Sequence, residues 1–285
     1  MQFNSEWKDY EIIATGGGEK LERWKNVKLL RPDPQIIWPA RRDLTRESGL
    51  NAHYIRESTG GGFWENLKSF PDNWVVSWRN LNFLVKPMGF KHTGLFPEQA
   101  VNWSKMINLI ENSKREIKVL NLFAYTGGAT VACASAGASV VHVDSSKGMV
   151  ERAKENLKLS SLQDRPVRFI IDDCAKFVQR EIRRGNKYDG IIMDPPSYGR
   201  GPSGEIWKIE ENIYDFVKLC FQVLSDNPLF FLINSYTTGL QPTVMQNILM
   251  LNNNNKFKKI EAYEVGLPTD EQIVLPCGAS AIAFN

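Results

Sequence analysis

Three short segments of the chain join a strand-like apolar run to a polar or glycine-bearing turn. They are VLNLFAYTGGA at residues 119–129, VVHVD at 140–144 and IIMDPPSY at 191–198. In an open α/β sheet, ligands bind in the crevice at the carboxyl ends of the strands. The three segments therefore predict one crevice that binds a nucleoside-bearing cofactor and holds a second, flat substrate above it.

The turn YTGG at 125–128 indicates what kind of cofactor this is. Glycine allows the backbone to approach a ligand, and the N–H groups at the start of the next helix point at it. A dinucleotide site usually carries the three spaced glycines of GxGxxG. Only two are present here, which disfavours a dehydrogenase. The pattern favours a smaller ligand with a carboxylate and a cationic sulfur, S-adenosylmethionine (SAM).

Acidic residues end the next two predicted strands. Asp144 is placed to accept both ribose hydroxyls of such a cofactor. Asp172 and Asp173 follow the third strand, and we favour Asp173 as the partner of the adenine amino group, with Cys174 beside the ring. The alternative for each aspartate alone is a helix N-cap, and Asp173 before a helical run fits that alternative well. The agreement of three strand ends favours cofactor binding.

The segment DPPSY at 194–198 predicts where the methyl acceptor binds. Two prolines fix an extended turn and remove backbone donors. The Asp194 carboxylate and the Pro195 carbonyl then remain as acceptors for a planar amino or ring nitrogen, with Tyr198 as the stacking aromatic. Methyl transfer is an in-line displacement that depends on alignment, so it needs no catalytic histidine. The alternative is that the two prolines merely end a strand.

Two flanking segments could close over this crevice. The loop GRGPSG at 199–204 could contact phosphate through Arg200, or it could be a surface loop. The segment FKHTGLFPEQ at 90–99 could contact the cofactor through Lys91 and Gln99, or it could be an interdomain linker.

The residues from 117 onward alternate between strand-like and helix-like patterns. Strands are predicted at 118–123, 139–144, 167–171, 188–193, 229–234, about 257–264 and 279–284. Helices are predicted at 127–136, 147–159, 174–184, 210–225 and 242–251. This alternation predicts a parallel, doubly wound sheet. The last two strands lack a helix between them and are expected to pair antiparallel. The fold class is therefore α/β, a Rossmann-like class I methyltransferase with a seven-stranded, mostly parallel sheet.

The residues before 105 have a different composition. Seven of the eight tryptophans lie there, among extended runs at 10–14, 28–30, 35–38, 74–78 and 82–86 that turn residues separate. We predict a small β-rich module at 1–104, with 105–285 as the methyltransferase domain entered through a helix at 106–112. The tryptophans could fill a small core or stack on bases.

Composition and charge limit the remaining possibilities. A net charge of +3 allows RNA binding but does not indicate it. The four cysteines and three histidines are scattered without metal-ligand spacing, so no metal site is expected and the thiols are expected to be reduced. The polar, acidic start and the absence of a long apolar run predict a cytoplasmic protein that does not enter the membrane.

Several of these motifs together resemble a known family. They are HTGLFPEQ at 92–99, NLFAYTGG at 121–128, VDS at 143–145, AKEN at 153–156, DD at 172–173 and DPPSY at 194–198. Over roughly residues 82–285 the chain is similar to the bacterial 23S ribosomal RNA methyltransferases related to the cytosine-C5 enzymes. The resemblance implies a Rossmann-like domain that binds SAM and releases S-adenosylhomocysteine.

The candidate site combines the motifs with this resemblance. The expected cofactor contacts are Gln99, Phe123, Tyr125, Thr126, Gly127, Asp144, Ser145, Asp173 and Asp194. The expected catalytic residues are Asp194, Pro195 and Tyr198.

Two departures from the family affect the predicted reaction. The RNA-binding PUA domain is not evident, and C5 methylation needs a cysteine nucleophile that relatives carry after the fifth strand. Here that strand ends INSYTT at 233–238, with no cysteine, and Cys277, at the turn before the last strand, is an unlikely substitute. We therefore expect methylation of a base in ribosomal RNA, at a nitrogen rather than at C5. The alternatives are a small-molecule or protein side-chain methyltransferase and, less favoured because the motifs are intact, a non-catalytic binding module.

Overall fold

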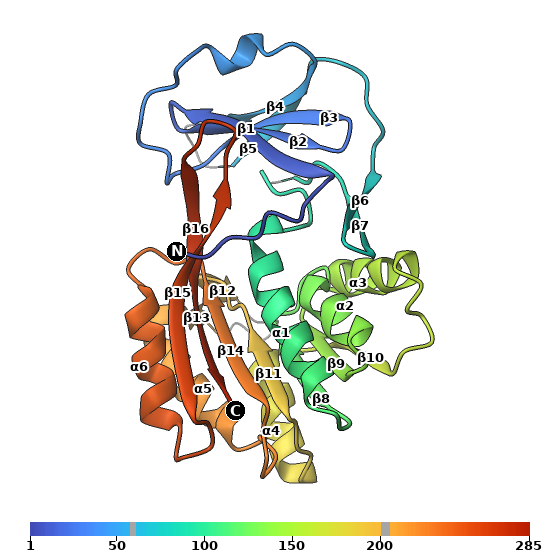
Figure 1. Cartoon of the computed structure of the whole chain (residues 1–285), viewed down its shortest axis with the longest axis vertical. Coiled ribbons are helices and arrows are strands. Elements are labelled where there is room, and N and C mark those ends of the chain that lie inside the picture. The colour runs from blue at the N-terminus through green and yellow to red at the C-terminus, as the bar shows by residue number, and fades with distance from the viewer. Residues whose placement is uncertain (58–60, 90, 201–205) are drawn as a thin grey trace. The chain divides into compact units, whose positions relative to one another are not determined.

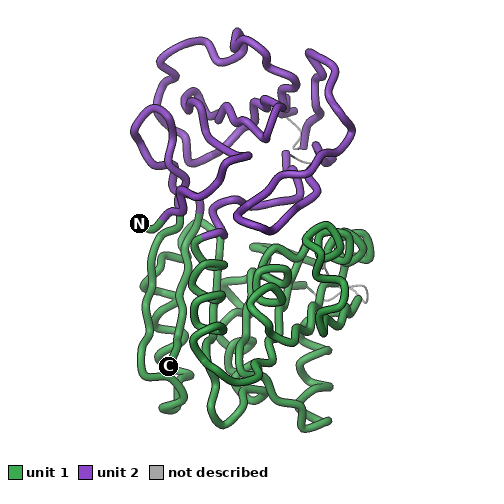
Figure 2. Tube along the Cα trace, turned by 45° about the vertical axis from the view of Figure 1, so that its right-hand side comes forward, with its two compact units in different colours: residues 1–2, 101–265, 278–285 green, residues 3–100, 266–277 purple. Residues whose placement is uncertain are grey.

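The computed structural model describes residues 1–57, 61–89, 91–200 and 206–285. The chain divides into two compact units (Figure 2). Unit 1 contains residues 1–2, 101–265 and 278–285, and unit 2 contains residues 3–100 and 266–277. Whether the domains divide at residues 104 and 105 stays a prediction.

Unit 1 is built on a seven-stranded sheet with the order β10-β9-β8-β11-β14-β16-β15. The strands are β8 (Lys118–Leu122), β9 (Ser139–Asp144), β10 (Val167–Ile171), β11 (Gly190–Met193), β14 (Phe230–Ser235), β15 (Lys259–Pro268) and β16 (Val274–Phe284). Neighbours from β10 through β14 pair parallel, and β16 pairs antiparallel with β14. The predicted fold class, including the reversed strand, is confirmed.

Helices cover both faces of this sheet (Figure 1). They are α1 (Ala100–Asn112), α2 (Gly128–Ser135), α3 (Lys147–Leu159), α4 (Cys174–Arg184), α5 (Ile209–Phe221) and α6 (Pro242–Asn252). Alternate strand residues point to opposite faces. Leu120, Ile191 and Ile233, with others of their parity, form one apolar core with α4, α5 and α6. Residues of the other parity, such as Asn121 and Asn234, therefore face the side that holds α1, α2 and α3.

The two long C-terminal strands differ from the prediction. Both β15 and β16 extend beyond the expected bounds, and residues 266–277, which join them and form their adjacent ends, belong to unit 2. The placement of Cys277 at a turn before the last strand is therefore wrong, because the residue lies within β16.

Unit 2 contains a five-stranded sheet, a separate hairpin and two short 3-10 helices. The sheet order is β1 (Tyr10–Gly16), β2 (Glu19–Trp24), β3 (Val27–Pro32), β4 (Leu50–Arg56) and β5 (Gly62–Asn66), and the hairpin is β6 (Trp74–Trp78) with β7 (Leu81–Val85). The 3-10 helices are η1 (Leu44–Arg46) and η2 (Pro97–Gln99). The prediction that the N-terminal module is rich in β-strands is confirmed, but the extended run predicted at 35–38 is not a strand.

Charge pairing explains the strand β2 that the pattern did not predict. Its Glu22 is fully buried and accepts hydrogen bonds from Arg31 Nε at 2.5 Å and Tyr10 Oη at 2.6 Å. Because Arg31 lies on the neighbouring strand β3, the pair satisfies a charge that would otherwise exclude this segment from a core. Trp24 and Trp78 are also fully buried, so these two tryptophans fill the core of unit 2.

Within the described part of the chain, none of the helices combines the length and apolar character that crossing a bilayer requires.

Candidate functional site

The loop after β8 has an unusual backbone. Phe123 and Tyr125 have φ values of 54° and 50°, in the left-handed region that few residues other than glycine adopt. The Tyr125 N–H donates to Asp144 Oδ2 at 2.8 Å, and the Ala124 N–H donates to the Val143 carbonyl at 3.1 Å. These hydrogen bonds tie the loop after β8 to the end of β9 and stabilise its strained backbone conformation.

The two glycines of this loop are required by packing. Gly127 has a φ of 81°, and a Cβ there would lie 2.8 Å from the Cβ of Ala153 in α3. A Cβ on Gly128 would lie 2.5 Å from the ring of Trp103 in α1. The sequence suggested a role in approaching a ligand, but close contact with two helices already demands glycine at both positions.

A buried polar cluster supports the loop from behind. Asn121 Nδ2 donates to Thr130 Oγ1 at 2.9 Å, and that hydroxyl is 2.9 Å from His142 Nδ1. Asn156 Nδ2 donates to the Thr126 carbonyl at 2.8 Å. Burial lowers the pKa of His142 to about 3, so the ring is neutral at physiological pH. The cluster positions the loop and supplies no acid or base.

Asp144 is the last residue of β9, and backbone N–H groups contact both of its carboxylate oxygens. Its Oδ1 accepts the Ser146 N–H and its Oδ2 accepts the Tyr125 N–H, both at 2.8 Å. A carboxylate accepts about four hydrogen bonds, so acceptor positions remain for a pair of hydroxyls. Burial raises the pKa of this carboxyl above its ordinary value. Ser145, the next residue, is exposed.

The two aspartates after β10 make structural contacts. Asp173 is the N-cap of α4 and accepts the Lys176 N–H at 2.8 Å. Asp172 accepts the Asp173 N–H and pairs with Arg180. Cys174 is buried, and its sulfur accepts the Phe123 N–H at 3.3 Å. The capping alternative for Asp173 is thus realised, and a contact with adenine stays a prediction.

The DPPSY segment follows β11 directly. Asp194 Oδ1 accepts a hydrogen bond from Asn234 Nδ2 at 2.9 Å. Pro195 is buried, whereas Tyr198 begins β12 (Tyr198–Arg200) and is 51% exposed. The Ser197 and Thr237 hydroxyls are 2.6 Å apart and connect this turn to the segment after β14. A stacking role for the Tyr198 ring stays a prediction.

Trp207 is an aromatic of this region that the sequence did not single out. It lies in β13 (Ile206–Lys208), which pairs antiparallel with β12. Its Nε1–H donates to the Pro196 carbonyl at 2.7 Å, and its ring centre is 5.4 Å from that of Phe123 and 5.6 Å from that of Phe216. The available signal was its isolation, since it is the one tryptophan after residue 105. Most of the loop predicted at 199–204, with the Arg200 side chain, lies outside the described residues.

Gln99 and Lys91 belong to unit 2. Gln99 ends η2, where its N–H donates to the Phe96 carbonyl at 3.1 Å. Lys91 Nζ donates to the Pro32 carbonyl at 3.3 Å, and burial lowers the pKa of the amine to about 8. A cofactor contact by either residue stays a prediction.

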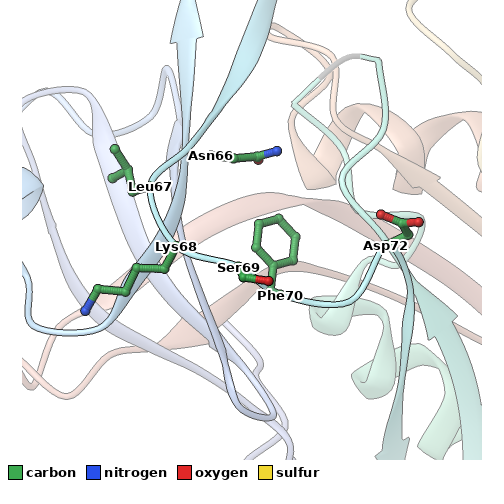
Figure 3. A pocket seen from close by; sticks show the side chains of 6 residues that line it. All are labelled: Asn66, Leu67, Lys68, Ser69, Phe70 and Asp72. Carbon is green, nitrogen blue, oxygen red and sulfur yellow. The ribbon is translucent and has the colours of Figure 1, made fainter.

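Unit 2 also carries a pocket of about 320 Å³ that residues of the loop after β5 line. Figure 3 shows Lys68 and Asp72 on opposite sides of the Phe70 ring, with the Lys68 amine directed away from Asp72. Because an active site needs polar groups that converge, this pocket is a poor candidate for chemistry.

Comparison with known proteins agrees with this geometry. Residues 51–210 match a family described as S-adenosylmethionine-dependent methyltransferase. A crystal structure of the SAM dependent methyltransferase from Agrobacterium tumefaciens shares 32% identity and superimposes with a TM-score of 0.92, over 99% of this chain and 92% of that one.

Two curated relatives carry ribosomal names. Ribosomal RNA large subunit methyltransferase K/L from Syntrophotalea carbinolica is 29% identical over 183 residues, which is 64% of this chain and 25% of that protein. Ribosomal RNA large subunit methyltransferase I from Salmonella arizonae is 34% identical over 119 residues, which is 41% of this chain and 28% of that protein. The chain thus spans about a quarter of the length of these two relatives.

Proposed function

The chain belongs to the family of S-adenosylmethionine-dependent methyltransferases, and we propose that it methylates a base nitrogen of ribosomal RNA in the cytoplasm. SAM is the methyl donor. When bound, it supplies a methyl group on a sulfonium centre and leaves as S-adenosylhomocysteine.

Most of the residues proposed to hold SAM lie at or just after the carboxyl ends of β8, β9, β10 and β11. Asp144 offers unused acceptor positions to the ribose, and the strained loop at 123–127 presents backbone next to it. Gly127 keeps this loop close to α3. The remaining proposed contacts are Gln99, Phe123, Tyr125, Thr126, Ser145, Asp173 and Asp194.

The observation that carries the proposal for the acceptor is the fixed Asp-Pro-Pro turn. Asn234 holds the Asp194 carboxylate at one oxygen, and Trp207 holds the turn through the Pro196 carbonyl. Asp194 and the Pro195 carbonyl would accept N–H groups of a planar base, and Tyr198 would stack on it. Such alignment is what an in-line methyl transfer requires.

The state of the cysteines supports nitrogen over carbon as the acceptor. C5 methylation of a pyrimidine needs a thiolate nucleophile, and thiolates form where the pKa is lowered. Burial instead raises the pKa of each of the four thiols, Cys133, Cys174, Cys220 and Cys277. Transfer to a nitrogen needs no covalent intermediate.

The names of the curated relatives support ribosomal RNA as the substrate. The test is transfer of tritiated methyl from SAM to ribosomal RNA purified from a strain that lacks the gene. We expect incorporation with that RNA and little with RNA from the parent strain, which is already modified. Equal incorporation into both, or none while SAM binds, would contradict the proposal and point to a small-molecule or protein acceptor.

A further inference from the structure

A continuous chain of hydrogen bonds leads from Asp194 to the edge of the sheet in unit 1. Tyr263 Oη donates to Asn102 Oδ1 at 2.7 Å, and Asn102 Nδ2 donates to Ser280 Oγ at 3.0 Å. Ser280 Oγ donates to Asn234 Oδ1 at 2.8 Å, and Asn234 Nδ2 donates to Asp194 Oδ1 at 2.9 Å. The four residues behind Asp194 are all buried, with at most 6% of each exposed.

The sheet register brings these side chains together. Asn234 and Ser280 are direct partners in the β14–β16 ladder, and Met193 pairs with Ile233, so Asp194 comes next to Asn234. Tyr263 lies on β15 beside β16, and Asn102 is in the first turn of α1. The series of hydrogen bonds therefore runs from the end of β11 across β14 and β16 to β15, on the face of the sheet that holds α1 (Figure 1).

All four hydrogen bonds donate in the same direction, from Tyr263 toward Asp194. An ionised Asp194 can only accept, so Asn234 presents its NH₂ group and must itself accept from Ser280. The Ser280 proton is then used, so Ser280 accepts from Asn102, which accepts from Tyr263. Aligned hydrogen bonds polarise one another, and a donor to a carboxylate favours its charged form.

Stability alone does not explain these polar residues. They stand in a layer where neighbouring positions such as Leu232 and Ile282 are apolar and buried. Burying polar groups costs free energy that hydrogen bonds only about offset, and well-packed apolar side chains would serve the fold equally. A satisfied network does fix the geometry of its members.

We propose that Asn234, Ser280, Asn102 and Tyr263 form a positioning network that holds the Asp194 carboxylate in one orientation toward the methyl acceptor. This inference rests on the proposed function, in which Asp194 receives an N–H of the base. None of the four residues needs to touch substrate. Their contribution is therefore expected in kcat, with little change in the binding of SAM.

The test uses the far end of the network, where packing is least disturbed. Tyr263→Phe removes only the hydroxyl that donates to Asn102. The matched control is Tyr188→Phe, which removes the hydroxyl of another buried tyrosine, one that donates to Glu181 at 2.6 Å. With tritiated SAM and ribosomal RNA from the deletion strain, we expect Tyr263→Phe to lower kcat between about twofold and tenfold, because one neutral hydrogen bond is lost. KM for RNA, the SAM affinity and the control should stay near wild type.

A double variant separates positioning from general destabilisation. Asn234→Ala should lower kcat about ten- to hundredfold, since it removes the donor to the charged group. Adding Tyr263→Phe to it should lower kcat no further, because the connection to Asp194 is already broken. The control for the asparagine is Asn252→Ala, whose buried amide donates to the Ile248 carbonyl at 2.9 Å.

Each outcome bears on the inference. Wild-type kcat in Tyr263→Phe, or losses that add fully in the double variant, would overturn the network. A wild-type protein that binds SAM but transfers no methyl to RNA would overturn the proposed function, and this inference with it. Thermal melting of every variant identifies a loss that is due to unfolding.

Discussion

At the scale of single residues, the proposed methyl transfer depends mainly on two carboxylates. Asp144 and Asp194 lie at strand ends as expected. The ambiguity at Asp173 persisted, because the same position suits a cap and an adenine ligand. The sequence singles out Gly127 and Gly128 for approach to a ligand, whereas their contacts with Ala153 and Trp103 involve other helices and leave no local signal.

Asp144 carries a prediction about pH. In the proposed site, the ionised Asp144 carboxylate would accept two ribose hydroxyls, and burial raises the pKa of this carboxyl. Protonation as the pH falls through that raised pKa therefore removes acceptors. We expect the Kd for SAM, measured by calorimetry over a pH series, to rise as the pH is lowered. Asp144→Asn should bind about tenfold or more weakly and show a flatter profile, since a hydrogen bond to a charged group contributes about 1.5–3 kcal/mol. Parallel profiles for the two proteins would contradict the assignment.

At the scale of elements, the sequence did not predict the two-stranded antiparallel ribbon that β12 and β13 form. Each strand has three residues, and the sequence between them is rich in glycine, proline and serine, so the pattern suggested only a loop. The contacts that define the ribbon are not local, because Trp207 bonds Pro196 and packs against Phe123 from a different strand end. Short strands that depend on such contacts lack the periodicity that sequence patterns detect.

Trp207 provides the prediction for this element. Trp207→Phe keeps a ring near Phe123 and Phe216 but removes the donor to Pro196, whereas Trp207→Ala removes both. We expect kcat/KM for RNA to fall between about twofold and tenfold in the first variant, because one hydrogen bond is lost, and further in the second.

The control for Trp207 is Tyr214→Ala, which removes a 41% exposed aromatic ring from α5. It should retain wild-type kinetics. Equal kinetics in Trp207→Ala and the wild-type protein would show that the ribbon does not hold the Asp-Pro-Pro turn.

At the scale of the whole molecule, the two units differed in how far the sequence revealed them. The apolar strands of unit 1 alternate with amphipathic helices, so its sheet could be predicted. Unit 2 buries charged residues such as Glu22 and Arg31 on adjacent strands, and no local pattern announces that pairing. The network behind Asp194 joins residues up to 178 positions apart, which only the folded chain reveals.

The free energy of unfolding should depend on acid pH through one histidine in each unit. Burial lowers the pKa of His142 in unit 1 to about 3 and that of His92 in unit 2 to about 4. Each pKa is lower in the folded state than in the unfolded state, where it is about 6.5, so the unfolded chain binds more protons below that pH. Stability should therefore fall as pH decreases from about 6.5, with a slope approaching about 1.4 kcal/mol per pH unit for each ring.

Urea unfolding at several pH values measures this dependence for the wild-type protein and for His142→Gln. The variant is expected to be less stable near neutral pH, because the buried ring is lost, but to have a shallower decline with acid. Identical slopes would mean that His142 is not a buried neutral ring.

The most direct measurement is mass spectrometry of nucleosides from ribosomal RNA that the purified protein has modified with trideuteromethyl-labelled SAM. Protein carrying Asp194→Ala serves as the control. We expect the label on a ring or exocyclic nitrogen of one base with the wild-type protein and its loss with the variant. Label on pyrimidine C5, or undiminished label with Asp194→Ala, would contradict nitrogen methylation at the Asp-Pro-Pro turn.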